Sequence, residues 1–161
     1  MVGMTLRRLV SKVANRVVVE RCMHLLAPHQ VGVGVRGGSE AAVHTARAYL
    51  ESCLPDSGIL KLDFKNAFNC IQRDSFLECV ALHVPELLPL LISAYSAPSL
   101  LSFGQYVIAS EEGVQQGDPL GPLLFSLCVS EVLESCAGEI VVSFLGGSLW
   151  GDSIKLALEP A

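Results

Sequence analysis

The order of apolar and polar positions along the chain predicts a series of helices interrupted by short strands. Apolar residues recur with helical spacing over residues 5–26, 39–51, 74–84, 85–95 and 119–135. Apolar runs bounded by turn residues predict a strand that ends at Asp63 and two β-hairpins, 100–103 with 106–109 and 139–144 with 148–151. This pattern predicts an α+β fold in which the helices pack on one face of a small antiparallel sheet.

The strand that ends at Asp63 delivers a carboxylate to the point where the chain turns into the next helix. The run is bounded by Ser57-Gly58, and the aromatic residue Phe68 follows the acid five residues later. A carboxylate at the end of a buried strand is well placed to meet a ligand or a metal ion. The same residue also suits a plain helix cap, because Asp is a favoured N-cap. The strand by itself leaves both interpretations open.

A second block, Gln-Gly-Asp-Pro-Leu-Gly-Pro at residues 116–122, opens the last predicted helix. Its two glycines let the backbone approach another molecule closely, and its two prolines suit the first turn of a helix. Gln116 offers both hydrogen-bond donors and acceptors beside that turn. The block is more specific than an ordinary glycine- and proline-rich loop, so it indicates a binding site.

These blocks resemble those of the reverse transcriptases, most closely the enzymes of non-long-terminal-repeat retrotransposons, which copy RNA into DNA. The segments that carry the resemblance are residues 3–9, 32–42, 62–68, 94–98 and 113–122. The first two look like parts of the fingers. The resemblance implies a single partial reverse transcriptase domain, with a helical fingers-like segment over about 1–57, a polymerase-like palm over about 58–161 and no thumb.

The resemblance also assigns roles to residues of the first two blocks. Asp63 corresponds to the first catalytic aspartate of the palm, which binds metal in the family. Phe64 and Phe68 would contact the nucleotide, and Phe68 would screen the 2′ position of its sugar. Gln116 and Gly117 would line the pocket for the incoming nucleotide and the template.

The third block departs from the family pattern of an aromatic residue, a variable residue and two aspartates on a tight hairpin. Residues 144–147 read Phe-Leu-Gly-Gly, so Gly146 and Gly147 stand where the family has its aspartates. A Gly-Gly pair suits a two-residue hairpin turn. The resemblance implies two Mg²⁺ ions about 4 Å apart, and clustered carboxylates must offset their mutual repulsion. Asp63 alone would hold one ion weakly at best, and Asp152 would help only if the hairpin were shifted. We therefore expect no productively bound Mg²⁺ and no catalysis.

Charge is distributed unevenly along the chain, although its net value is only −5. Residues 1–50 carry seven basic and two acidic side chains, a net charge of +5, whereas the remaining residues have a net charge of −10. A basic fingers segment beside an acidic palm is what a protein that grips phosphate groups and binds cations would show.

Arg8, Lys12 and Arg16 follow one another at intervals of four residues, so they share one face of the first predicted helix. We predict that these three side chains, together with Arg36, bind an RNA template or an RNA/DNA hybrid. The alternative is a solvated helix face on which Arg16 pairs with Glu20.

Hydrophobic residues make up 51% of the chain and charged residues only 17%, which is more apolar than a typical self-contained domain. We therefore expect a protein partner to cover some apolar surface. The apolar stretch over residues 81–103 is interrupted by three prolines and is not suited to span a membrane. Without a signal peptide, the expected location is intracellular, nuclear or cytoplasmic. The six cysteines form no Cys-x-x-Cys pair, which is typical of reduced core residues.

Three functional hypotheses follow. The first is a reverse transcriptase fragment that has lost catalysis. The second is a nucleic-acid or protein interaction module that keeps the fold without the metal. The third is an active enzyme completed by acids from another chain.

Overall fold

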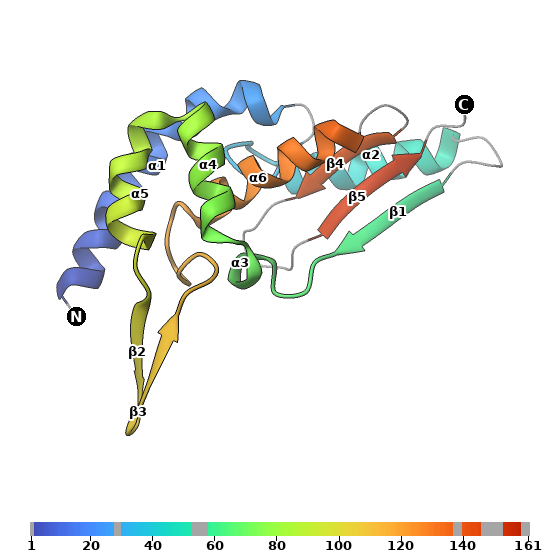
Figure 1. Ribbon diagram of the computed structural model, residues 1–161. Helices are drawn as coiled ribbons and strands as arrows, with labels where there is room; N and C mark the ends of the chain where they lie inside the picture. The colour runs from blue at the N-terminus through green and yellow to red at the C-terminus, as the bar shows by residue number, and fades with distance from the viewer. Residues whose placement is uncertain (1, 28–29, 53–57, 137–139, 146–152, 159–161) are drawn as a thin grey trace.

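The structure, a computed structural model, describes residues 2–27, 30–52, 58–136, 140–145 and 153–158. Its helices are α1 (Val2–Leu26), α2 (Gly38–Ser52), α3 (Ala67–Cys70), α4 (Arg73–His83), the short 3-10 helix η1 (Pro85–Leu87), α5 (Leu88–Tyr95) and α6 (Gly121–Cys136). Its strands are β1 (Gly58–Asp63), β2 (Ser99–Phe103), β3 (Tyr106–Ser110), β4 (Ile140–Leu145) and β5 (Ser153–Leu158). In Figure 1, α1, α4 and α5 gather toward one side, β1, β4 and β5 lie toward the other, and α6 lies between them. The predicted α+β fold is confirmed.

Local sequence explains where several helices begin. Pro85 opens η1 and Pro89 lies in the first turn of α5, positions that suit a residue without a backbone N–H. The sequence pattern did not predict the short helix α3. Asn66, just before it, has φ of 53°, a left-handed conformation that asparagine tolerates better than most residues. This turn directs the chain from β1 into α3.

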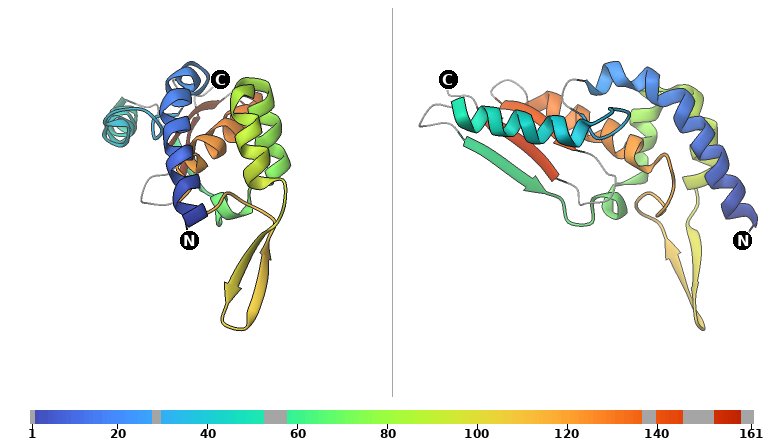
Figure 2. Two further views of the ribbon diagram at one scale, coloured as in Figure 1. Left: turned by 90° about the vertical axis from the view of Figure 1, so that its left-hand side faces the viewer. Right: turned by 180° about the vertical axis from the view of Figure 1, so that it is seen from behind.

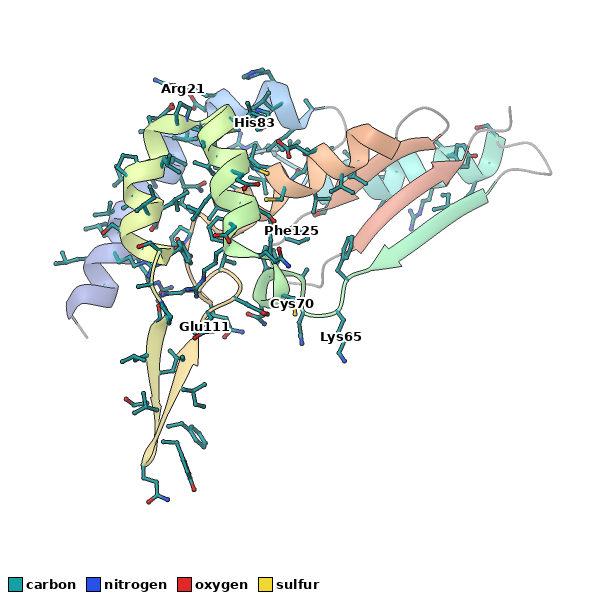
Figure 3. The ribbon with its side chains drawn as sticks, in the orientation of Figure 1. Arg21, Lys65, Cys70, His83, Glu111 and Phe125 are labelled. Carbon is teal, nitrogen blue, oxygen red and sulfur yellow. The ribbon has the colours of Figure 1, made fainter. Side chains whose placement is uncertain are left out.

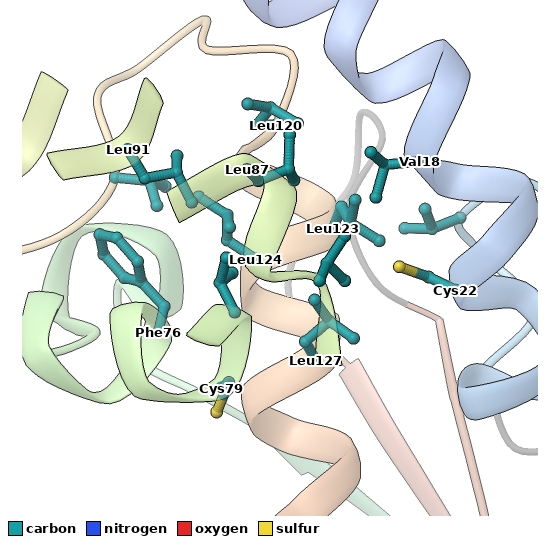
Figure 4. Packing of buried hydrophobic residues seen from close by; sticks show 14 of the residues in the cluster. Val18, Cys22, Phe76, Cys79, Leu87, Leu91, Leu120, Leu123, Leu124 and Leu127 are labelled. Atoms are coloured by element: carbon teal, nitrogen blue, oxygen red, sulfur yellow. The ribbon is translucent and has the colours of Figure 1, made fainter. Parts of the chain in front are cut away.

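The hydrophobic core lies where α1, α4, α5 and α6 meet (Figure 4). It includes Leu123, Leu124 and Leu127 of α6 and also Leu120, which directly precedes that helix. The side chains that face them are Val18 and Cys22 of α1, Phe76 and Val80 of α4, and Leu87 and Leu91 around α5. Each fully buried leucine contributes roughly 1.5–3 kcal/mol. The core therefore fixes α6, and with it the turn that leads into α6, against three other helices.

A buried glutamine, Gln30, connects the loop between α1 and α2 to helix α6. Gln30 Nε2 donates a hydrogen bond to Ser126 Oγ at 2.9 Å. Its Oε1 accepts hydrogen bonds from the backbone N–H groups of Gly32 at 2.6 Å and Val33 at 2.9 Å. Both polar atoms of the Gln30 side chain therefore have hydrogen-bond partners, which is what burial of an amide requires.

The main sheet has the strand order β1-β5-β4, and both pairs are antiparallel. Residues 153–158 are its central strand, and α2 packs against β1 and β4. Figure 2 shows α2 running alongside the sheet on the side away from the viewer of Figure 1.

The register corrects the predicted last hairpin. A two-residue Gly-Gly turn would pair Leu145 with Ser148, but Leu145 pairs with Ser153. The described strand that pairs with β4 is therefore residues 153–158, whereas the predicted strand 148–151 and the predicted Gly-Gly turn lie outside the described residues. The pairing of residues 153–158 with β1 as well as β4 sets this register.

Helix α1 buries a narrower face than its apolar content suggests. Ser11, Val18, Cys22 and Leu26 are buried. The large apolar residues on the rest of its first four turns are exposed: Leu6, Leu9, Val10, Val13 and Val17. Among the described residues, no helix is long and apolar enough to cross a membrane.

The described cysteines with assigned environments are free thiols. Cys22 and Cys79 are buried and Cys128 is half-buried, as expected for core residues. Cys70 is exposed, so the prediction of a core position is wrong for that residue. It lies at the end of the four-residue helix α3, which has too little surface to bury every side chain.

Candidate functional site

The turn between β3 and α6, residues 112–120, is built directly on the backbone of the first sequence block. The N–H of Val114 donates to the carbonyl of Phe68 at 2.8 Å. Gly113 has φ of +71°, and a Cβ at this position would lie 2.5 Å from the carbonyl oxygen of Asn69. Only glycine allows so close an approach. The two blocks recognised in the sequence therefore touch in the structure.

A buried carboxylate organises the interior of this turn. Asp118 Oδ2 accepts hydrogen bonds from the hydroxyl of Tyr95 at 2.7 Å and from Arg7 Nη2 at 3.3 Å. Its Oδ1 accepts from the backbone N–H of Leu120 at 3.0 Å. The guanidinium of Arg7 also lies 4.7 Å from the centre of the Tyr95 ring, within the range of a cation–π interaction. One carboxylate thus joins α1, α5 and the start of α6.

The environment of Tyr95 keeps its hydroxyl protonated. Burial raises the pKa of Tyr95 above its ordinary value, and the hydrogen bond to Asp118 and the negative charge of that residue raise the pKa further. The hydroxyl also accepts a hydrogen bond from the backbone N–H of Gln115 at 3.2 Å. Tyr95 therefore remains a donor to Asp118 and an acceptor from the turn.

A buried arginine holds the other side of the turn. Arg73 Nε donates to the carbonyl of Gly113 at 3.2 Å, and Nη1 donates to the carbonyl of Ala97 at 3.3 Å. Its Nη2 lies 3.4 Å from both the carbonyl of Glu112 and the hydroxyl of Ser110. The guanidinium fork therefore bridges the two ends of the β2–β3 hairpin and the first residues of the turn.

A groove of about 540 Å³ runs between α1 and the turn. Its lining includes Arg8, Lys12 and Arg16 of α1 and Pro119 of the turn. These three cations are exposed. Gly117 has φ of +78°, and a Cβ there would lie 3.3 Å from Arg8 Nη2, so the guanidinium rests beside the glycine backbone. The structure thereby brings the predicted basic face and the predicted binding turn together.

The ion pairs found among the described residues are Arg7–Asp118, Arg21–Glu86 and His83–Glu131. Arg16 belongs to none of these pairs. The alternative prediction, an ion pair between Arg16 and Glu20, therefore has no support among the described residues. None of the described residues that line the groove is acidic. Arg36, the fourth predicted cation, is exposed in the loop before α2 and does not line the groove.

Phe64 and Phe68, predicted to contact a nucleotide, pack around Phe125 of α6. The ring of Phe68 lies 5.0 Å from that of Phe125, and the ring of Phe64 lies 6.2 Å from it. Phe64 and Phe125 also line a largely apolar cavity of about 740 Å³ between α3, α4 and α6. Figure 3 shows two further lining residues, Lys65 and Cys70, at the turn after β1. The predicted nucleotide-binding residues thus form two groups, this aromatic pair and the exposed Gln116–Gly117 pair.

The register of the sheet shows where the remaining acid stands. Asp63 at the end of β1 and Leu145 at the end of β4 both pair with Ser153, one on each side of β5. The chain continues from Leu145 into Gly146 and Gly147, which lie outside the described residues. The backbone therefore places Asp63 at the same sheet end as Leu145, the last described residue before Gly146 and Gly147 in the sequence.

The donor set at this sheet end does not fit a pair of Mg²⁺ ions. Mg²⁺ takes oxygen ligands in near-octahedral geometry and is usually bound through carboxylates, but glycine stands at both positions where the resemblance expects aspartate. Among the described residues, no cluster of three or more Asp, Glu, His or Cys side chains could hold a metal ion. Asp152, the other acid considered, lies outside the described residues.

Sequence reasoning missed the side chains that hold the turn in place, Arg7, Arg73, Tyr95 and Asp118. Tyr95 and Asp118 fall inside segments that carried the family resemblance, and Arg7 is next to a predicted cation. Their partners lie far apart in the chain: Arg7 and Asp118 have a sequence separation of 111. No local pattern reveals such a contact.

Comparison with known proteins shows the family to which the chain belongs. The family model described as reverse transcriptase (RNA-dependent DNA polymerase) matches residues 3–147. The chain therefore belongs to the reverse transcriptase family. A comparison with curated proteins found no match.

Among solved structures, the chain is similar to an apo telomerase from Candida tropicalis truncated from its C-terminal domain, with a TM-score of 0.55 and 15% sequence identity. The match covers 96% of this chain and 34% of that protein, so the chain spans about a third of its length. At this identity the likeness shows the polymerase-like fold, which agrees with the predicted fold class.

Proposed function

We propose that this chain is a fingers and palm portion of a reverse transcriptase domain of the non-long-terminal-repeat retrotransposon type, which binds a nucleic-acid strand but does not catalyse nucleotide addition. The observation that carries the binding role is the groove lined by Arg8, Lys12 and Arg16 of α1 and by Pro119 of the turn, where Arg8 also lies beside Gly117. The sequence of residues 113–122 supports the retrotransposon type.

The groove has the chemistry of a phosphate-backbone site. Successive cations at four-residue spacing are about 6 Å apart along a helix, so they form a row rather than a single point of charge. In the part of the chain that the structure describes, no carboxylate lines the groove to neutralise them. The adjoining glycine backbone of Gly117 lets a strand approach closely, while Gln116 offers an exposed amide. Such a row supplies strong, salt-dependent attraction for a strand and little base specificity.

The absence of catalysis follows from the third block. Two-metal phosphoryl transfer needs ligands for both ions close to the reacting phosphate. Asp63 is the family position that this chain retains, and Gly146 and Gly147 supply no side-chain ligand. When bound, the ions would polarise the attacking hydroxyl and the leaving phosphate, and this chain lacks the carboxylates to keep them there.

The binding proposal is tested with the purified chain and a primed RNA template over a series of salt concentrations. We expect affinity to fall steeply with salt. Arg8→Ala with Lys12→Ala should reduce the salt slope by about 1.4, the value for two phosphate contacts on a single strand. Arg21→Ala with Arg47→Ala, which changes the net charge equally on other surfaces, should leave the slope near that of the parent chain. If the variant with Arg8→Ala and Lys12→Ala has the same RNA affinity and salt slope as the parent chain, the groove assignment is contradicted.

The catalytic proposal is tested by primer extension with Mg²⁺. We expect no template-dependent incorporation by the unaltered chain. Incorporation that Asp63→Asn abolishes would overturn the inactive assignment, and a parallel loss in Asp152→Asn would identify the compensating acid. Incorporation only in the presence of a second protein would instead support an enzyme completed by another chain.

The competing interaction-module hypothesis, in which protein rather than nucleic acid is the partner, makes a different prediction. A chain that folds cooperatively yet binds no RNA at low salt would favour that hypothesis. A chain that does not fold at all would indicate a retroelement relic without a function of its own.

A further inference from the structure

Asn15 of α1 has a buried side-chain oxygen, Oδ1, that has no hydrogen-bond partner among the described residues. In the described part of the chain it is the one buried side-chain nitrogen or oxygen atom of this kind. The buried polar groups of Gln30, Arg73 and Asp118 are all paired, as is usual in folded proteins. An unpaired buried acceptor lowers stability, so the free chain bears a cost that a donor from a ligand would remove.

Asn15 lines the groove between α1 and the turn, together with the row of cations. It follows Lys12 by three residues and directly precedes Arg16, so it lies next to that row on the helix. It also lies four residues after Ser11 and three before Val18, which are both buried. Asn15 is half-buried, whereas the cations are exposed. Its side chain therefore lies deeper in the groove than the cations do.

The chemistry of an amide oxygen limits what it can bind. Oδ1 of Asn15 only accepts hydrogen bonds, and the phosphate groups that join nucleotides offer acceptors but no donor. A phosphate held by the cations therefore cannot pair with this oxygen. The 2′-hydroxyl of a ribose can, because it is a donor as well as an acceptor, and the sugar of DNA has no such group.

The position of Asn15 favours a sugar over a base as the source of that donor. A strand bound through its backbone places its phosphates at the row of cations, and each phosphate is bonded directly to a sugar. Three residues rise about 4.5 Å along a helix, so Asn15 is one short step from a phosphate bound at Lys12. The bases project farther from the backbone than the sugars do.

We propose that Asn15 is the residue by which the groove distinguishes RNA from DNA, through a hydrogen bond that a ribose 2′-hydroxyl donates to its Oδ1. This inference rests on the proposed function, because it requires a strand in the groove. The oxygen is shielded in the free chain, so the side chain must rotate toward the strand. The terminal torsion of asparagine is broad, and the bound ribose then supplies the donor that the interior does not.

The test compares the affinity of the purified chain for oligouridine and for oligodeoxyuridine of the same length, measured by fluorescence anisotropy at low salt. The two strands have the same bases and phosphates and differ only in their sugars. We expect the chain to bind the RNA strand about fivefold more tightly, as for one net hydrogen bond. A 2′-fluoro strand, which has a polar substituent at that position but no donor, should bind like the DNA strand.

Asn15→Leu removes the acceptor and keeps a side chain of similar shape. Its affinity for the RNA strand should fall about fivefold, to that for the DNA strand. Asn69→Leu is the matched control, because it makes the same change at an exposed asparagine of α3 that does not line the groove. The control should retain the preference for RNA. The melting temperature of Asn15→Leu should not fall, because the variant loses an unpaired buried atom, whereas loss of a structural hydrogen bond would lower it.

Several results would overturn the proposal, and they separate it from the proposed function. A parent chain that binds both strands equally, with a steep salt dependence, would refute the role of Asn15 and leave the proposed function standing. A parent chain that binds neither strand would refute both. Equal losses for RNA and DNA in Asn15→Leu would show that the donor belongs to a base. A 2′-fluoro strand that binds as tightly as RNA would show that no 2′ donor is used.

Discussion

The turn before α6 and the sheet end at Asp63 are the two places that polymerase chemistry needs side by side, yet they are built differently. The turn contains a buried carboxylate with three donors, and it is held by the buried Arg73 of α4, which has four acceptors. At the sheet end stands Asp63, and glycine occupies the other two positions where the resemblance expects aspartate, Gly146 and Gly147, which lie outside the described residues. The turn proposed to bind a strand is therefore held by buried groups that also hold the protein together.

This difference has a physical cause. Carboxylates clustered for metal binding repel one another when no metal is bound, so their loss costs the fold little. The groups that hold the turn are buried and mutually satisfied, so removing one leaves the others without partners. Under the proposed function, the two glycines therefore remove metal ligands while the groove stays intact.

The largest effect should come from Asp118→Ala. This change leaves Arg7, the Tyr95 hydroxyl and a backbone N–H without their acceptor, so the free energy of unfolding should fall by about 3 kcal/mol. Urea denaturation monitored by circular dichroism measures the loss. Glu111→Ala, which removes an exposed acid nearby, should change it by less than about 0.5 kcal/mol. Equal effects of the two changes would mean that the buried network does not stabilise the turn.

The next effect is a loss of stability at alkaline pH through Cys22, which seats α1 in the core. Burial, assisted by the charge of Glu86, raises the pKa of Cys22 from 9.0 to about 11. The folded protein thus retains a proton that the unfolded chain releases. The stabilisation is complete below pH 9 and is lost as pH rises toward 11, by roughly 2 kcal/mol. In the Cys22→Val variant, the free energy of unfolding should depend less on pH between pH 9 and 11. Cys70→Ala, a change at an exposed position, should leave the pH dependence of the free energy of unfolding as it is in the parent chain.

A smaller effect is expected for Tyr95→Phe, which removes one hydroxyl and keeps the ring. Asp118 retains Arg7 and a backbone donor, so the cost should be about 1.5 kcal/mol, the value of one hydrogen bond to a charged group. Because the turn also loosens, RNA affinity should fall in the same variant. A variant whose stability falls while its RNA affinity is unchanged would separate the buried network from the groove.

The smallest change in stability should follow Gly146→Asp with Gly147→Asp. Without metal, the free energy of unfolding should change by less than about 1 kcal/mol, because the core does not depend on this sheet end. Millimolar Mg²⁺ should then raise the melting temperature of the double variant and not that of the parent. A parent chain that Mg²⁺ stabilises equally would contradict the view that its donor set cannot hold the ions.

The local sequence pattern predicted most of the helices and strands, and each element that it missed or misplaced has a physical reason. The five long helical segments and the β2–β3 hairpin were predicted close to their observed bounds, because helical spacing and a Gly-Gln turn between two short apolar runs are local signals. The second strand of the last hairpin was misplaced because β5 pairs with both β1 and β4, and pairing with β1 is a long-range contact. Helix α3 was missed because four residues carry no periodicity.

For the site, the sequence by itself determined the family, the row of cations on α1 and the glycines at positions 146 and 147, because each is a matter of residue type and spacing. Only the tertiary structure decided that this row lines a groove with Pro119, that Asp118 is held by Arg7 and Tyr95, and that Phe64 and Phe68 pack around Phe125 instead of joining Gln116. Such contacts connect side chains far apart in the chain, so their free energy depends on the packing of whole helices and leaves no local trace.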